Sequence, residues 1–183
     1  MKNLCVVFPG RKYSVDRSLL YYPSKLIKDR GYEMIYLHYD QPKESVDEDF
    51  NISLNRANNY LNTHAVSTYD FYSYDEVIFL SKSIGTVLSG QLKEKNKNAN
   101  IYQILLTPIE ESLKYIDNKD LILCGENDSY LKDAKNKLAM FSNSYIFPNF
   151  SHSLESKTNY HLTLKTVEDV TGIVEEYINS YKL

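Results

Sequence analysis

Six apolar runs rich in β-branched and aromatic residues constrain the fold of this chain more than any other feature. They lie at residues 4–8, 33–39, 76–80, 101–106, 121–124 and 144–148. Each has the length of a strand, and most are continuously apolar rather than alternating between apolar and polar residues. Continuous apolar character is typical of strands covered on both faces, as in a parallel sheet between two layers of helices.

Segments with helical spacing separate these runs. They cover residues 18–31, 47–65, 86–95, 129–141 and 165–182, whereas residues 107–120 have room only for a short helix or a turn. Pro23 either kinks the first helix or marks its first turn, because proline lacks the N–H that a helix interior uses. Strands that alternate with helices predict an α/β fold, a three-layer sandwich around a mainly parallel six-stranded sheet.

The length of the chain predicts one domain. With 183 residues the chain can bury one substantial core but hardly two, and it contains no linker and no internal repeat. We therefore expect a single α/β domain over residues 1–183. Nothing in the sequence predicts an oligomeric state.

Composition argues against several classes of function. Hydrophobic residues make up 43% of the chain and charged residues 25%, the net charge is −3, and bases are interspersed with acids, so we expect a globular protein without a nucleic-acid partner. The apolar start of the chain is too short for a signal peptide and no segment approaches membrane-spanning length, which favours a cytoplasmic protein without membrane contact. Cys5 and Cys124 lie in separate strand-like runs and lack the spacing of a metal site or a redox pair.

Polar segments directly follow four of the predicted strands. In parallel α/β sheets ligands bind beyond the carboxyl ends of the strands, so these segments are where chemistry is expected. They read PGRKYS after the first strand, SKSIG after the third, GENDSY after the fifth and NFSHSLE after the sixth. In SKSIG, Ser83 lies between a strand and a helix with a small residue two positions to either side, which indicates a sharp turn that exposes the serine hydroxyl.

The order serine, acid, histidine along the chain resembles that of the α/β-hydrolase superfamily, and the chain is similar to a small, uncapped serine hydrolase of that superfamily. The resemblance extends from Asn3 to the last helix, although the chain lacks the family's usual N-terminal antiparallel strands. It implies a sheet of order 2-1-3-4-5-6. It also implies a strained turn with positive φ at Ser83. One departure is Ser81, at a position where the family most often has glycine.

Carried over residue by residue, the resemblance implies Ser83 as nucleophile, His152 as base and Asp128 as acid. A serine hydroxyl needs a neighbouring imidazole to take its proton, and a carboxylate orients the imidazole and stabilises its cationic form. Glu126 is the rival acid. Asp128 could instead serve only as the N-cap of the helix that follows it.

The resemblance also implies an oxyanion hole, a pair of backbone N–H groups that bind the developing negative charge of acyl transfer. One donor is assigned to Ile84, directly after the nucleophile, and the other to Arg11, with Lys12 as the alternative. Arg11, Lys12 and Lys82 fall near the predicted mouth of the site. They are either solvated charges or charges that favour anionic acyl groups.

These expectations describe a cofactor-independent enzyme without a metal, which cleaves an ester, thioester or similar acyl bond of a small molecule through an acyl-serine intermediate. The short connection after the fourth strand leaves little room for a lid, so the expected substrate-binding residues flank an open site: Tyr13, Tyr130 and Phe150. Two alternatives remain, a non-catalytic binding module with the same fold and an acyltransferase that uses the same site.

Overall fold

The fold is built on one parallel sheet, seen in a computed structural model that describes residues 1–39, 49–131 and 134–181. Its six strands have the order β2-β1-β3-β4-β5-β6, and all five neighbouring pairs are parallel. The strands are β1 (Asn3–Phe8), β2 (Glu33–Tyr36), β3 (Glu76–Lys82), β4 (Ile101–Leu106), β5 (Leu121–Gly125) and β6 (Ser144–Phe147). The α/β class and the strand order predicted from the sequence are confirmed.

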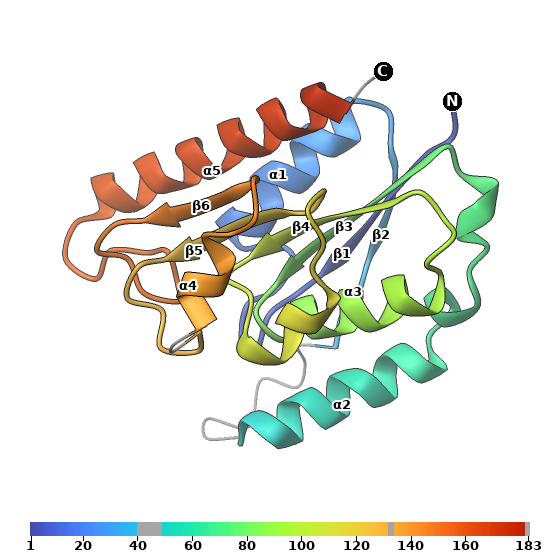
Figure 1. The fold of residues 1–183 in the computed structure, drawn as a ribbon, viewed down its shortest axis with the longest axis horizontal. Helices are drawn as coiled ribbons and strands as arrows, with labels where there is room; N and C mark the ends of the chain where they lie inside the picture. The colour runs from blue at the N-terminus through green and yellow to red at the C-terminus, as the bar shows by residue number, and fades with distance from the viewer. Residues whose placement is uncertain (40–48, 132–133, 182–183) are drawn as a thin grey trace.

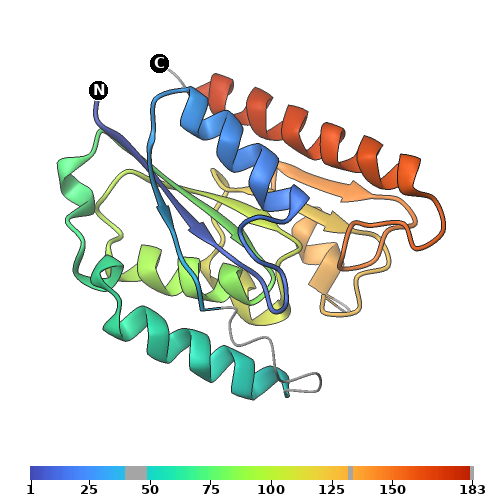
Figure 2. The same ribbon diagram turned by 180° about the vertical axis from the view of Figure 1, so that it is seen from behind.

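Helices cover both faces of the sheet. The α-helices are α1 (Ser18–Asp29), α2 (Phe50–Thr63), α3 (Ile84–Lys95), α4 (Lys135–Leu138) and α5 (Tyr160–Tyr181), and short 3-10 helices lie at Ala65–Thr68, Phe71–Ser73 and Glu110–Tyr115. Helices α1 and α5 lie side by side on one face, whereas α3 covers the other face with α2 packed outside it (Figures 1 and 2). The result is a three-layer sandwich.

The sheet residues divide between two cores according to the two-residue period of a strand. In β1, Cys5 and Val7 belong to the core beneath α1 and α5, whereas Leu4, Val6 and Phe8 belong to the core beneath α2 and α3. All five side chains are fully buried. Burial on both faces explains why the central strands read as continuous apolar runs.

The second strand is shorter than its apolar run predicts, because β2 ends at Tyr36 rather than at residue 39. It is an edge strand that pairs only with β1, and its register reaches the partner pair Val7 and Tyr36. Beyond that pair one further bond continues the edge, from Leu37 N to Val7 O at 3.1 Å. The paired part of β2 therefore stops one residue before β1 ends at Phe8.

The helix predicted over residues 129–141 is wrong in extent. Within the described part of that segment only α4 is α-helical, and residues 132 and 133 lie outside the described residues. Local hydrogen bonds favour turns there: the Asp128 side chain accepts from Tyr130 N, and Leu131 N and Ala134 N each donate to a carbonyl three residues earlier. Bonds of that span tighten the chain into turns instead of extending a helix.

Other helix boundaries differ by a few residues. Helix α5 begins at Tyr160, five residues before the predicted start, because the Asn159 side chain caps it by accepting from the backbone N–H groups of His161 and Leu162. Helix α2 begins after Asp49, whose carboxylate accepts from Asn51 N at 2.7 Å. The first two residues of the predicted second helix lie outside the described residues. Pro23 lies inside α1 rather than at its first turn.

Candidate active site

Ser83 lies in the turn that joins β3 to α3, and its backbone is strained. Its φ of 54° and ψ of −122° fall outside the regions that non-glycine residues favour, so the positive φ predicted from the sequence is confirmed. Two glycines make the turn possible. A Cβ on Gly85 would lie 2.6 Å from the carbonyl oxygens of Phe8 and Pro9, and one on Gly10 would lie 3.3 Å from Ser83 Cβ. The absence of side chains at both positions lets the end of β1 approach the serine closely.

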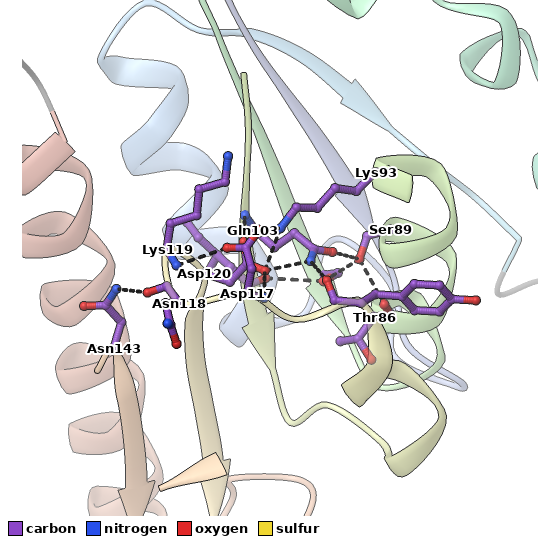
Figure 3. A network of polar contacts seen from close by, with 12 residues as sticks. Thr86, Ser89, Lys93, Gln103, Asp117, Asn118, Lys119, Asp120 and Asn143 are labelled. Carbon is purple, nitrogen blue, oxygen red and sulfur yellow. Dashed lines mark hydrogen bonds and ion pairs between the residues drawn. The ribbon is translucent and has the colours of Figure 1, made fainter. Parts of the chain in front are cut away.

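Ser81, which stands where the family most often has glycine, is fully buried. Its hydroxyl donates to Ile104 O at 3.3 Å, and Ser89 of α3 donates to it at 3.2 Å. The Ser89 hydroxyl also lies 3.1 Å from Gln103 Oε1, an alternative acceptor for its one hydrogen, within the polar network of Figure 3. A polar side chain is therefore accommodated two residues before Ser83 because helix and sheet supply hydrogen-bond partners.

The structure brings Ser83, His152 and Asp128 together from three separate loops. Nε2 of His152 lies 2.9 Å from Ser83 Oγ, and Nδ1 of His152 lies 2.8 Å from Asp128 Oδ2. The side chain of Asp128 is fully buried, whereas 20% of the His152 side chain is exposed. An imidazole hydrogen-bonded to a carboxylate on one nitrogen and to a hydroxyl on the other can accept the hydroxyl proton.

The two readings of Asp128 are both present in the structure, because its two carboxylate oxygens have different partners. Oδ1 accepts from Tyr130 N at 2.9 Å, which caps the local turn, while Oδ2 contacts the ring of His152. The cap acts on a turn and not on the long helix expected there. Capping therefore fixes the carboxylate in the orientation that reaches the imidazole.

Glu126, the rival acid, is exposed and contacts the histidine loop at another point. Its Oε2 accepts from Asn149 N at 2.9 Å, and Asn127 N donates to Phe150 O at 2.8 Å. The loop after β5 and the loop after β6 are thus bonded to each other. A Cβ on Gly125 would overlap the carbonyl oxygen of Phe150, so this close approach also depends on glycine.

Lys82, expected near the mouth, is buried instead, with 2% of its surface exposed. Its Nζ donates to Thr107 Oγ1 at 2.7 Å and to the backbone oxygen of His152 at 3.1 Å, and it lies 4.8 Å from the centre of the Tyr13 ring. Burial lowers the pKa of Lys82 from 10.5 to about 8, and the negative charges of Asp128 and Glu155 partly oppose that shift.

A cavity of about 250 Å³ opens beside Ser83. It is lined by Arg11, Lys12, Phe50, Ser83, Tyr130 and His152. The Tyr130 ring lies 4.5 Å from the His152 ring and 6.1 Å from the Phe50 ring, centre to centre, so aromatic side chains form one side of the cavity.

Of the three predicted substrate-binding residues, only Tyr130 lines this cavity. The Tyr13 hydroxyl accepts from Leu19 N at 3.1 Å, and Phe150 is buried near Phe147. Phe50, which sequence reasoning missed, is the first residue of α2. It lies inside the predicted helix of residues 47–65, and its distance in sequence from every strand end gave no signal.

Two segments next to this cavity contain the backbone N–H groups expected to form the oxyanion hole. Ile84 is the first residue of α3, so its N–H has no partner within the helix. The segment from Gly10 to Tyr13 forms a tight turn, with Gly10 N donating to Tyr13 O at 2.9 Å and Tyr13 N to Gly10 O at 3.2 Å. Its two central residues, Arg11 and Lys12, both line the cavity, and Lys12 has a φ of 54°.

Three further features concern metal binding, the cysteines and membrane-spanning helices. The described residues contain no group of three or more His, Cys, Asp or Glu side chains placed to hold a metal ion. Cys5 and Cys124 are buried and form no disulfide in the described part of the chain, and burial raises the pKa of the Cys5 thiol. No helix in the described part of the chain combines the length and apolar character needed to cross a membrane.

Comparison with solved structures identifies related folds. A member of the α/β serine hydrolases without a lid from Xanthomonas campestris is 12% identical, with 98% of this chain and 82% of that chain covered at a TM-score of 0.66. An α/β serine hydrolase homologue from Coxiella burnetii is 13% identical, with 93% and 84% covered at 0.57. Est1E from Butyrivibrio proteoclasticus, whose structure holds ferulic acid, is 13% identical, with 97% and 90% covered at 0.56. No family model and no curated protein matches the sequence significantly.

These similarities extend over nearly the whole chain although sequence identity is low. At such identity they establish the architecture, and the activity has to be argued from the site itself. The structural neighbours across the chain are α/β-hydrolase superfamily members. Together with the all-parallel sheet of order 2-1-3-4-5-6, they show that the chain has the α/β-hydrolase fold.

Proposed function

We propose that this protein is a cofactor-independent serine hydrolase that cleaves an ester, thioester or similar acyl bond of a small molecule. The observation that carries the proposal is the continuous contact from Ser83 Oγ to His152 Nε2 at 2.9 Å and from His152 Nδ1 to Asp128 Oδ2 at 2.8 Å. The serine borders the cavity and the carboxylate is buried behind the ring. This is the order of groups that acyl transfer to a serine requires.

In the proposed reaction Ser83 Oγ attacks the carbonyl carbon of the substrate while its proton passes to Nε2 of His152. The carboxylate of Asp128 holds the ring by its Nδ1–H and stabilises the imidazolium that forms. When the tetrahedral intermediate collapses, His152 returns the proton to the leaving oxygen or sulfur, which departs and leaves an acyl-Ser83. Water, activated by the same imidazole, then attacks the acyl-enzyme and releases the acid.

The negative charge of each tetrahedral intermediate needs donors that are already in place. The N–H of Ile84 at the start of α3 provides one, because the adjacent Ser83 carries the carbonyl carbon. The turn from Gly10 to Tyr13 supplies the second through Arg11 or Lys12, both of which line the cavity. The positive end of the α3 dipole adds to the stabilisation.

The size of the cavity and the structural neighbours support a small-molecule substrate. A cavity of about 250 Å³ accommodates a short acyl group or one aromatic ring beside the rings of Tyr130 and Phe50. The neighbour Est1E binds ferulic acid, a small aromatic acid. We therefore place small aromatic and short-chain acyl compounds first among the substrates to test.

A fluorophosphonate probe tests the proposal directly, because it reacts with a serine only when a base activates the hydroxyl. We expect the wild type to be labelled at Ser83 and the Ser83→Ala variant to remain unlabelled, with turnover of chromogenic esters lower by at least ~10³-fold. Ser81→Ala is the matched control, because it removes a neighbouring serine that faces away from the cavity.

The probe also separates the alternatives. A non-catalytic binding module would not be labelled, and equal labelling of wild type and Ser83→Ala would reject Ser83 as nucleophile. An acyltransferase would be labelled like a hydrolase, but added alcohol or amine acceptors would divert most of the product from the free acid.

A further inference from the structure

The histidine loop after β6 depends on tertiary contacts for its position. Residues 148–159 contain no helix or strand, and two of them, Asn149 and Leu154, have positive φ values of 64° and 54°. Non-glycine residues persist in that conformation only where the surroundings hold them. The orientation of His152 is therefore set by the groups that contact it.

Two buried charged groups contact His152 from opposite ends of the residue. The carboxylate of Asp128 binds the ring nitrogen Nδ1, and the amine of Lys82 binds the backbone oxygen at 3.1 Å. Lys82 immediately precedes Ser83, so one side chain connects the strand that carries the serine to the loop that carries the histidine. Nothing in the proposed reaction uses Lys82, yet it is almost fully buried.

Three titratable groups surround the Lys82 amine, namely Asp128 after β5, Glu155 after β6 and Tyr13 after β1, and the backbone oxygen of His152 contacts it directly. In the described part of the chain neither carboxylate forms a direct ion pair with Lys82. Its direct partners are neutral oxygens. The positive charge of Lys82 is thus stabilised only by carboxylates at longer range. Because no direct ion pair offsets its burial, the amine loses its proton at a lower pH than an exposed lysine does.

We propose that Lys82 is a positioning residue, which in its ammonium form holds the backbone of His152 so that the imidazole stays within hydrogen-bond distance of Ser83. An ammonium is a stronger donor than a neutral amine, because its hydrogen bonds are charge-assisted. Loss of the proton weakens the link to the His152 carbonyl and releases the strained loop. The inference rests on the proposed hydrolase function, and it predicts that the enzyme loses activity on the alkaline side.

The second hydrogen-bond partner of the Lys82 amine, Thr107, supports this positioning role. Thr107, which directly follows β4 and has a φ of 45°, accepts from Lys82 Nζ at 2.7 Å, while its own N–H donates to Leu123 O at 2.6 Å. Thr107 is thus fixed to β5 and offers the amine a rigid acceptor. Lys82 is held at one end by the sheet and at the other end holds the histidine loop.

The experiment compares wild type with Lys82→Met, which keeps a long apolar side chain but removes the donor. At pH 7 we expect kcat to fall by about 10- to 100-fold with KM within about twofold, since a displaced base slows proton transfer without changing substrate contacts. The wild type should lose kcat above a pH of about 8, where Lys82 deprotonates. The variant should lack this alkaline limb. An alkaline limb of the same midpoint in Lys82→Met would overturn the inference.

Two further variants separate positioning from a purely structural role. Thr107→Val removes one acceptor of the ammonium, so the alkaline limb should move to lower pH, and Thr107→Ser should restore it. Lys93→Met is the matched control, because it removes another largely buried lysine that contacts Asp117 and Asp120 and not His152. It should lower the unfolding midpoint and leave the pH profile of kcat unchanged. A change of profile in Lys93→Met equal to that in Lys82→Met would reject the positioning role.

A readout without turnover distinguishes failure of this inference from failure of the proposed function. Imidazole NMR signals of His152 in wild type should change near pH 8, as the ammonium is lost, and should not change there in Lys82→Met. If the wild type is not labelled by a fluorophosphonate but shows this NMR change, the hydrolase proposal fails and the contact between Lys82 and His152 stands. If labelling occurs and both proteins give the same NMR titration, the role of Lys82 is refuted.

Discussion

Two largely buried lysines lie at opposite ends of the same sheet, and their ammonium groups have different kinds of hydrogen-bond partner. Lys93, in the last turn of α3, forms ion pairs with Asp117 at 2.8 Å and with Asp120 at 2.7 Å (Figure 3). Lys82, at the carboxyl end of β3, donates to two neutral oxygens instead. One ammonium has carboxylates in direct contact, whereas the other depends on carboxylates at longer range.

The surroundings of Lys93 form a closed network. Asp120 is fully buried and accepts from Lys93, from the backbone and side chain of Gln103 and from Asp117 N (Figure 3). Burial raises the pKa of the Asp120 carboxyl, and the charge of Lys93 opposes that shift. A network whose members satisfy one another makes the structure rigid and leaves no group available for a reaction.

At the other end of the sheet the polar groups open onto a cavity. Asp128 is as buried as Asp120, but its partner is an imidazole that also contacts Ser83. Burial of a charged group therefore does not by itself indicate function. What distinguishes the two ends is whether the network ends at a group that can exchange a proton with a bound molecule.

The largest expected effect separates the two buried aspartates by activity. Asp128→Asn keeps an oxygen that can cap Tyr130 N but removes the charge that stabilises the imidazolium, so kcat should fall by about 10⁴-fold while the unfolding midpoint hardly moves. Steady-state kinetics and urea unfolding measure both quantities. Glu126→Gln is the control and should leave kcat within about twofold. Full activity of Asp128→Asn would remove this carboxylate from the proposed triad.

The second largest effect is expected for Asp120→Ala, which should lower the unfolding free energy without changing kcat. Asp120→Ala removes a buried partner of Lys93 and leaves the donors of Gln103 without their acceptor, so the unfolding free energy should fall by about 3 kcal/mol. The kcat of the folded fraction should not change, because the network lies at the far end of the sheet from Ser83. A loss below about 1 kcal/mol, or a lower kcat in fully folded protein, would contradict this division of roles.

A third prediction concerns the pH dependence of stability that Lys82 produces. Burial lowers its pKa from 10.5 in the unfolded chain to about 8 in the folded one, so between these values only the unfolded state binds the proton. Stability of the wild type should therefore rise with pH relative to Lys82→Met, by about 3 kcal/mol in all. Below pH 8 the difference should be flat, because both states are protonated.

Urea unfolding of both proteins from pH 7 to pH 10.5 tests this sign. Subtraction of the Lys82→Met curve removes the contribution of other groups, such as Tyr32, whose pKa is raised by burial. A difference that falls with pH over this range would mean that Lys82 gains a proton on folding, contrary to its burial without a direct counter-ion.

Much of the fold and of the candidate site could be predicted from the sequence. Continuous apolar runs identify the strands because both faces of the sheet are buried, and polar segments after the strands indicate where a site is expected. Within those segments the family resemblance picked out Ser83, Asp128 and His152, which the structure brings together. The strand order came from the family resemblance and not from any spacing. Helix boundaries were less predictable, because caps such as Asn159 act through local geometry.

The buried state of Lys82 was missed, although its position carried a signal. Residues two apart in a strand point to the same face, and Ile78 and Leu80 belong to the core beneath α1 and α5. The period of β3 therefore directs Lys82 toward the same side. Lys82 was interpreted as a charge at the mouth of the site, either solvated or favouring anionic acyl groups, because sequence alone did not show that Thr107 and the His152 carbonyl would supply buried acceptors.

The smallest expected effect tests whether the two ends of the sheet are coupled. Ser81 lies between them, since the one hydroxyl hydrogen of Ser89 can be donated either to Ser81 or to Gln103 of the Lys93 network. Ser81→Ala removes the bond to Ile104 O, so the unfolding free energy should fall by about 1 kcal/mol, with kcat within about twofold of the wild type.

A double-mutant cycle of Ser81→Ala with Asp120→Ala, measured by urea unfolding, gives the coupling energy. We expect a value below about 0.5 kcal/mol, because Ser89 has alternative acceptors in Thr86 O and Gln103 Oε1 and does not transmit the loss of one bond to the other. A coupling above about 1 kcal/mol together with a lower kcat in Ser81→Ala would show instead that the closed network helps to hold the Ser83 turn. In that case the polar residue at the usual glycine position has a role in the active site, and the two ends of the sheet act as one unit.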